Sequence, residues 1–163
     1  MARDAHTEVR EYILGMRGET FLGEDFIEYL RQYLERYTRN YGIKVRLNID
    51  NTCTGSISTG MGRQLLRIIQ EALANVRKHA GSSSADISLL TEAGRLMLVI
   101  EDNGRGFDSD LVRLTKEKSF GLEIMEDRAK EIGGTLSISS VPNGGTKVTV
   151  QLQAAQKEGG KQV

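Results

Sequence analysis

The chain has 163 residues, which suits one domain with a short appendage better than two full domains. Lysine and arginine together number 22, and aspartate and glutamate also number 22, so the formal net charge is zero. The overall charge therefore gives no sign of the basic face that general nucleic-acid binding or an anionic membrane surface requires. With 39% hydrophobic and 27% charged residues, the composition is that of a globular protein.

The cysteine content and the N-terminus bear on the cellular compartment. Cys53 is the single cysteine and cannot form an internal disulfide, and no Cys/His group has the spacing of a zinc site. The first ten residues are too polar for a signal peptide, and no apolar run reaches the roughly 18 to 20 residues of a membrane span. We therefore expect a cytoplasmic chain, although its parent protein can be anchored in a membrane.

Periodicity predicts three elements in the first third of the chain. A short amphipathic helix stops near Gly18, with apolar residues at positions 9, 13 and 16. A core-packing helix over residues 25–41 follows, with Gly42 placed as its terminating glycine. Residues 43–49 alternate apolar and polar side chains, which predicts a strand with one buried face.

The middle of the chain predicts a loop, a long helix and a strand pair. Residues 51–60 are rich in Thr, Ser and Gly and predict the loop, and a helix follows from residue 61 to about residue 79. Two alternating strands, 85–90 and 96–101, are then joined by a hairpin-like connection.

The last third adds a helix and two more strands. We expect the helix over residues 121–132 and the strands over residues 136–140 and 146–152, with a Pro-Asn-Gly-Gly turn between them. Short turns join most strands, and long helices separate the groups of strands. The pattern therefore predicts an α+β fold, a two-layer α/β sandwich whose helices cover one face of a mixed sheet.

A first candidate site lies on the long helix. Glu71 and Asn75 are four residues apart, so a carboxylate and an amide oxygen converge on one face, and Lys78 and His79 follow a turn later. Magnesium takes one or two protein oxygens together with substrate phosphates, so this pattern suits a metal–phosphate site. By itself, the pattern is more typical of an ordinary solvated helix face.

Three glycine-containing segments could complete such a site. Asp102 ends a strand and precedes Gly104 and Gly106, which suits an acceptor for an exocyclic amine beside a backbone that a flat ligand can approach. Residues 120–122 open a helix whose free N–H groups could meet a phosphate, after a charged loop that could act as a lid. Residues 144–146 form the last segment, and each segment alone is also explained as a plain turn or helix start.

The order and spacing of the four segments are more specific than any one of them. The segments QEALANVRKHA, DNGRGFD, FGLEIMEDRAKEIGG and NGGTKVTV closely resemble the nucleotide-binding boxes of the GHKL ATPase superfamily, which includes histidine kinases, gyrase-type ATPases and MutL. The resemblance covers about residues 25 to 152, and within the superfamily the chain looks like the nitrate-sensor (NarX, LiaS and DesK-like) subfamily of sensor histidine kinases. It implies a Bergerat fold with a short ATP lid.

The resemblance also implies a domain organisation. The segment EVREYILGMR resembles the end of the second dimerisation helix of that subfamily, so residues 1–20 would be this helix end and a linker. Residues 21–153 would be the ATP-binding catalytic domain, and residues 154–163 a flexible tail.

The same resemblance implies ATP and Mg²⁺ as ligands and assigns roles to residues. Asn75 would bind Mg²⁺, with Glu71 helping to position the metal or the incoming nucleophile as the catalytic residue. Asp102 would accept a hydrogen bond from the adenine amino group, and Thr146 would bond near the adenine. The remaining ATP-binding residues would be Lys78 and His79 at the phosphates, Gly104 and Gly106 at the base and lid hinge, and Gly121 and Leu122 where the lid ends.

Neither histidine is expected to accept the phosphoryl group. In this subfamily the acceptor histidine precedes an acidic residue on the first dimerisation helix, whereas His6 precedes Thr7 and lies on what resembles the second. His79 belongs to the implied ATP site. The expected partners are therefore the dimerisation and phosphoacceptor domain of the same, homodimeric kinase and a downstream response regulator, with no nucleic acid and no membrane contact from this chain.

The resemblance leaves three functions open. The chain could deliver the γ-phosphoryl to a histidine on a dimerisation domain, act as a gyrase- or MutL-like conformational ATPase in which Glu71 activates water, or phosphorylate serine as anti-sigma kinases do. Only 13 residues separate Phe107 from Gly121, which is short for the lid of a conformational ATPase. The dimerisation-helix segment argues against the serine kinase.

Overall fold

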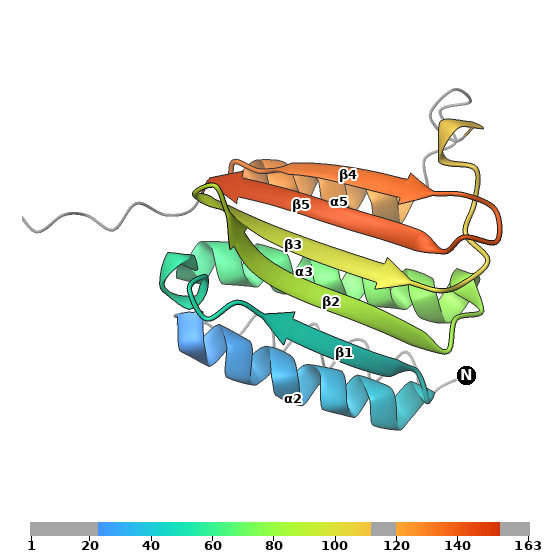
Figure 1. Ribbon diagram of the computed structural model, residues 1–163, viewed down its shortest axis with the longest axis horizontal. Helices are drawn as coiled ribbons and strands as arrows, with labels where there is room; N and C mark the ends of the chain where they lie inside the picture. The colour runs from blue at the N-terminus through green and yellow to red at the C-terminus, as the bar shows by residue number, and fades with distance from the viewer. Residues whose placement is uncertain (1–22, 112–119, 154–163) are drawn as a thin grey trace, which may run out of the picture.

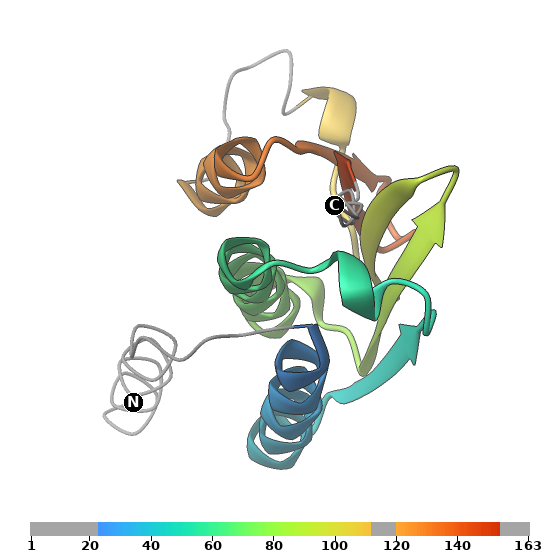
Figure 2. The same ribbon diagram turned by 90° about the vertical axis from the view of Figure 1, so that its left-hand side faces the viewer.

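In the part of the chain that the structure describes, a mixed sheet is backed on one face by three helices. The computed structural model describes residues 23–111 and 120–153, and in that part of the chain five strands lie in the order β1-β2-β3-β5-β4. Figures 1 and 2 show α2, α3 and α5 on the same side of this sheet. The bounds are α2 Gly23–Tyr41, β1 Lys44–Ile49, α3 Thr59–Asn75, β2 Ser84–Glu92, β3 Arg95–Asp102, α5 Phe120–Glu131, β4 Thr135–Ser140 and β5 Thr146–Gln153.

The strand pairing confirms the predicted two-layer α+β sandwich with helices on one face of a mixed sheet. β1 and β2 run parallel, because α3 crosses between them, and every other pair is antiparallel. The β2–β3 hairpin turns on Ala93 and Gly94, whose φ values are +49° and +73°. Two residues with positive φ match the turn that suits the twist of a hairpin.

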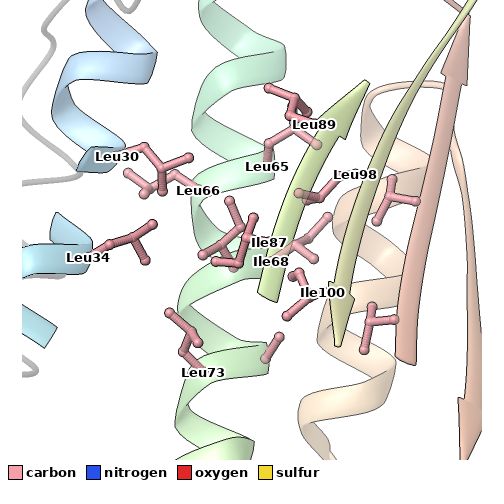
Figure 3. Close-up of a cluster of buried hydrophobic side chains, with 14 of the residues drawn as sticks. Leu30, Leu34, Leu65, Leu66, Ile68, Leu73, Ile87, Leu89, Leu98 and Ile100 are labelled. Carbon is pink, nitrogen blue, oxygen red and sulfur yellow. The ribbon is translucent and has the colours of Figure 1, made fainter. Parts of the chain in front are cut away.

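The core lies between the sheet and the helices. Along β3 the buried positions alternate, and Leu96, Leu98 and Ile100 are each at most 2% exposed. Figure 3 shows how side chains of β2 and β3 meet those of α3, which in turn meets α2. The labelled contributors are Leu30 and Leu34 of α2, Leu65, Leu66, Ile68 and Leu73 of α3, Ile87 and Leu89 of β2, and Leu98 and Ile100 of β3.

The long helix differs from its prediction in two respects. It begins at Thr59, where the side chain of Ser58 accepts a hydrogen bond from the backbone N–H of Met61. Its regular α-helical part ends at Asn75, and residues Val76–Ala80 form a π-helical turn before Gly81 adopts a left-handed φ of +60°. The predicted loop before it contains a 3₁₀ turn, Thr54–Ser56.

Two predicted segments and the lid lie outside the described residues. These are the N-terminal helix of residues 1–20, the tail of residues 154–163, and most of the lid, residues 112–119. Within residues 23–111 and 120–153, no helix combines the length and apolar character needed to cross a membrane.

Candidate functional site

A cavity of 530 Å³ lies between the C-terminal half of α3, the ends of β3 and β5, and the start of α5. Nine of the ten residues proposed from the sequence line this cavity, although they come from segments up to 75 positions apart in the chain. They are Glu71, Asn75, Lys78, His79, Asp102, Gly106, Gly121, Leu122 and Thr146.

The end of α3 supplies the first polar side of the cavity. Glu71 and Asn75 lie on its last two turns, and the π-helical turn then carries Lys78 and His79 to the same cavity. A π-helical turn widens the helix and is frequent at functional sites, because it shifts the direction of the side chains that follow. The sequence pattern predicted the four residues but not this turn.

The start of α5 approaches Glu71 closely. A Cβ placed on Gly121 would lie 2.3 Å from the Glu71 Oε1 atom, so only glycine permits this approach without movement of the carboxylate. Gly121 and Leu122 thus border the cavity in the first turn of α5.

The end of β3 supplies the second polar side. The Asp102 Oδ1 atom accepts a hydrogen bond from the backbone N–H of Gly104 at 2.7 Å, which orients the carboxylate at the strand end. Thr146, the first residue of β5, is the direct cross-strand partner of Asp102. These two polar side chains therefore stand side by side at one end of the cavity.

Gly104 is the one predicted site residue that does not line the cavity. It is buried against the π-helical turn, and a Cβ there would lie 2.3 Å from the backbone oxygen of Ala80. Next to it, the backbone N–H of Arg105 donates to the same Ala80 oxygen at 2.8 Å. Gly104 therefore lets the loop after β3 pack against the turn that carries Lys78 and His79.

Gly106 needs its lack of a side chain for a similar reason. Its φ is +57°, and a Cβ there would lie 2.1 Å from the backbone oxygen of Val141 and 2.8 Å from that of Gly145. The backbone N–H of Asn143 also donates to the Arg105 oxygen at 2.6 Å. The loop after β3 is thus packed against the β4–β5 turn.

The apolar lining was missed by the site prediction. In the sequence, Ala72 and Val76 look like ordinary apolar core residues of the helix, yet they line the cavity together with Glu71 and Asn75. Strand alternation could have found Ile100 and Val148, because each lies two residues from a predicted polar site residue and so points to the same face. The other members without a sequence signal are Ala80, Phe107 and Met125.

A second cavity of 320 Å³ lies on the other side of Glu71 and Lys78, which line both cavities. It lies among α2, α3 and α5, and three arginines, Arg67, Arg77 and Arg128, contribute to its lining. The guanidinium of Arg77 stacks over the Tyr41 ring at 4.6 Å. This neighbouring cavity is therefore rich in positive charge.

The donor set suits some metals better than others. No group of three or more His, Cys, Asp and Glu side chains suited to a metal ion occurs among the residues that the structure describes. One carboxylate and one amide oxygen, from Glu71 and Asn75, suit Mg²⁺, which keeps several of its waters and binds substrate phosphates.

Known proteins with similar sequences place the chain in a family. Residues 60–156 match the family described as histidine kinase-, DNA gyrase B-, and HSP90-like ATPase. The chain is 35% identical over 161 residues to the sensor histidine kinase LiaS of Bacillus subtilis, which covers 99% of this chain and 43% of LiaS. It is also 30% identical over 158 residues to the sensor protein VraS of Staphylococcus epidermidis. That match covers 97% of this chain and 44% of VraS.

Solved structures agree. The ATP-binding domain of PrrB from Mycobacterium tuberculosis matches with a TM-score of 0.59 and 26% identity, over 74% of this chain and 90% of that domain. The histidine kinase domain of a blue-light activated kinase from Erythrobacter litoralis shares the fold, with a TM-score of 0.66 and 23% identity. The match covers 83% of this chain and 62% of that chain. The chain spans less than half the length of its curated relatives LiaS and VraS. On its family match, this chain belongs to the histidine kinase-, DNA gyrase B-, and HSP90-like ATPase family.

Proposed function

We propose that the chain is the ATP-binding catalytic domain of a sensor histidine kinase, which binds Mg²⁺–ATP and delivers the γ-phosphoryl to a histidine on a dimerisation domain. One observation carries this proposal. A single cavity has Asp102 and Thr146 at one end, apolar walls, and Asn75 and Lys78 with Glu71 on the helix opposite. These are the features that a purine base, a sugar and a chain of phosphates would need.

The base would lie at the Asp102 end. The carboxylate accepts hydrogen bonds only, so it suits the exocyclic amine of adenine. Ile100 and Val148 would contact the flat face of the base, because both project into the cavity from neighbouring strands. Gly106 would leave room for the base and for the start of the lid.

The phosphates would lie toward α3 and the start of α5. Asn75 would hold Mg²⁺ through its amide oxygen, with Glu71 as a second oxygen nearby, and Lys78 and His79 would contact phosphate oxygens. Gly121 and Leu122 would border the phosphates at the start of α5. When bound, the metal would neutralise part of the charge that develops on the transferred group.

The residues of this chain would act mainly by positioning. Phosphoryl transfer requires the attacking and leaving atoms to be in line and needs little covalent work from the protein. Glu71 faces both cavities, so it stands where a nucleophile entering from the basic cavity would meet the phosphate end. We propose that it orients the acceptor histidine there.

The partners follow from this arrangement. The acceptor histidine would come from the dimerisation domain of the same kinase, which would be a homodimer, and the phosphoryl group would pass on to a response regulator. We propose a cytoplasmic location for the domain, since ATP and the regulator would both be found there. The names of the relatives LiaS and VraS, a sensor histidine kinase and a sensor protein, favour this reading over the conformational ATPase and the serine kinase.

The test is ATP binding by calorimetry with and without Mg²⁺. Asn75→Ala removes the amide oxygen and is expected to abolish the gain in affinity that Mg²⁺ gives the wild type. Asn51→Ala, at an exposed loop position, is the matched control and is expected to bind like the wild type. An Asn75→Ala variant with unchanged affinity in Mg²⁺ would contradict the proposal.

A further inference from the structure

A buried hydroxyl stands directly behind the base end of the cavity. Ser140, the last residue of β4, is 4% exposed and does not line the cavity. It is the cross-strand partner of Thr146, which in turn is the partner of Asp102. The three side chains therefore form a row across β3, β5 and β4, in the order Asp102, Thr146, Ser140.

The Ser140 hydroxyl makes three hydrogen bonds. Its Oγ atom lies 2.9 Å from the backbone nitrogen of Phe107, 2.8 Å from the backbone oxygen of Gly145, and 3.0 Å from the Thr146 Oγ1 atom. A serine hydroxyl has one hydrogen to donate and two lone pairs to accept with, so these contacts use its full capacity.

Counting donors and acceptors fixes the direction of each bond. The Gly145 carbonyl can only accept, so the one Ser140 hydrogen must point to it. The Phe107 N–H can only donate, so it fills one lone pair of Ser140. The second lone pair must then accept the hydrogen of the Thr146 hydroxyl, because otherwise two oxygens would face each other with no hydrogen between them.

The direction of these hydrogen bonds decides what Thr146 can offer to a ligand in the cavity. Because the Thr146 hydroxyl gives its hydrogen to Ser140, it presents only lone pairs to a ligand. Asp102 beside it is a carboxylate, whose Oδ1 already accepts from the Gly104 N–H. The polar wall at this end is therefore made of acceptors, and it matches a ligand group that donates two hydrogens.

We propose that Ser140 is a positioning residue for base selectivity: by taking the Thr146 hydrogen, it makes the wall accept a 6-amino purine and reject a 6-oxo purine. The inference rests on the proposed function, since it names what sets the selectivity of the same site. A 6-oxo group is an acceptor, so it would face two acceptors, and burying such an unpaired contact costs affinity.

The experiment measures the dissociation constants of ATP and of inosine triphosphate, its 6-oxo analogue, by calorimetry in Mg²⁺. Thr146→Val keeps the shape of the side chain and removes the acceptor, and Ser140→Ala frees the Thr146 hydroxyl to turn and donate. Each is expected to lower the preference for ATP by about threefold to tenfold, the range of one hydrogen bond. In the Thr146→Val background, adding Ser140→Ala is expected to leave the preference unchanged.

Matched controls stand on the same two strands. Ser139→Ala is the same substitution at the exposed neighbouring position of β4, and Thr149→Val lies on the opposite face of β5 from Thr146. Both are expected to keep the wild-type preference. Thermal unfolding of each variant separates a change in selectivity from a loss of fold.

The outcomes are distinct. If Ser140 only supports the fold, Ser140→Ala weakens both nucleotides equally and the preference does not move, which overturns the inference. If Ser140→Ala does not fold, Thr146→Val decides: a preference equal to that of the wild type means that the Thr146 hydroxyl does not set the preference for ATP, which also overturns the inference. A wild type that binds neither nucleotide overturns the proposed function instead.

Discussion

Individual glycines in this chain are fixed by close approaches of the backbone. Gly104 is the clearest case, because its neighbour is the Ala80 carbonyl, a backbone atom that cannot move independently of the π-helical turn. Gly121 faces the end of the Glu71 side chain, which can rotate away. A side chain at position 104 would therefore lower the stability of the fold, whereas one at position 121 would displace the Glu71 carboxylate from its place in the cavity.

Gly104→Ala is accordingly expected to lower the free energy of unfolding by about 1–3 kcal/mol, the usual cost of forcing extra atoms into a packed region. It should also weaken ATP binding, because the turn that it displaces carries Lys78 and His79. Chemical denaturation and calorimetry check the two effects. Gly60→Ala, with nothing within 4 Å, is the control and should be neutral or slightly stabilising. Equal stability of the two variants would contradict this account of Gly104.

Asp102→Asn tests the adenine contact at the same scale. Replacing one carboxylate oxygen by an NH₂ group turns an acceptor into a donor, so the variant should lose affinity for ATP more than for a triphosphate that lacks adenine. Competition binding with the two nucleotides measures the difference. Asp127→Asn, an exposed position on α5, is the control. An equal loss for both nucleotides would contradict the role of Asp102.

Among the elements, α2 is hydrogen-bonded to the backbone near the end of α3. The Tyr37 hydroxyl of α2 donates to the backbone oxygen of Leu73 at 2.8 Å, close to the point where α3 widens into the π-helical turn. The Val76 N–H also reaches the Leu73 oxygen. Tyr37 is 3% exposed, and burial raises its pKa to about 12, against a smaller opposing effect of Arg77.

The raised pKa predicts an alkaline effect on stability. The unfolded chain would ionise Tyr37 near pH 10 and the folded chain only near pH 12. Its contribution is therefore fully present below pH 10 and is lost as the pH rises through this window, by up to about 3 kcal/mol.

Tyr37→Phe removes both the hydrogen bond and the titration. At neutral pH it should cost about 1 kcal/mol, and above pH 10 its disadvantage should shrink. Denaturation curves at several pH values, with the absorbance of tyrosinate as a second readout, check this. Parallel stability–pH curves for variant and wild type would contradict it.

The elements also show what the sequence can and cannot predict. The strands were predicted to within two residues at each end, because the two faces of each strand differ in exposure and the alternation is clear. The π-helical turn was not predicted, because residues 76–80 continue the helical pattern of the sequence. The contacts that accompany the turn come from Tyr37 and Gly104, which lie in distant segments of the chain. Hydrogen bonds to the backbone leave no periodic signal.

The candidate site, too, was predicted from the sequence only in part. Its polar residues were identified from motif spacing, which reports side-chain chemistry. The apolar lining and the buried Ser140 were not identified, since a residue such as Val76 looks like any core residue in a sequence. The close approach of Gly104 to Ala80 carries no signal in the sequence, since the two residues are 24 positions apart.

For the whole molecule, two cavities meet at Glu71 and Lys78, which is the arrangement that the kinase proposal needs. Nucleotide would fill one cavity, and an acceptor would approach from the basic side. The zero net charge of the chain conceals the basic lining of the second cavity, where Arg67, Arg77 and Arg128 lie together.

The most direct test of the kinase proposal is to incubate the chain with γ-labelled ATP, Mg²⁺ and a separately supplied dimerisation domain of the parent kinase, and to map the labelled residue. The account predicts acid-labile label on a histidine of the supplied domain, none on His6 of this chain, and none anywhere with Asn75→Ala. Label on a serine, stable label on His6, or ATP hydrolysis that leaves the supplied domain unlabelled would contradict it.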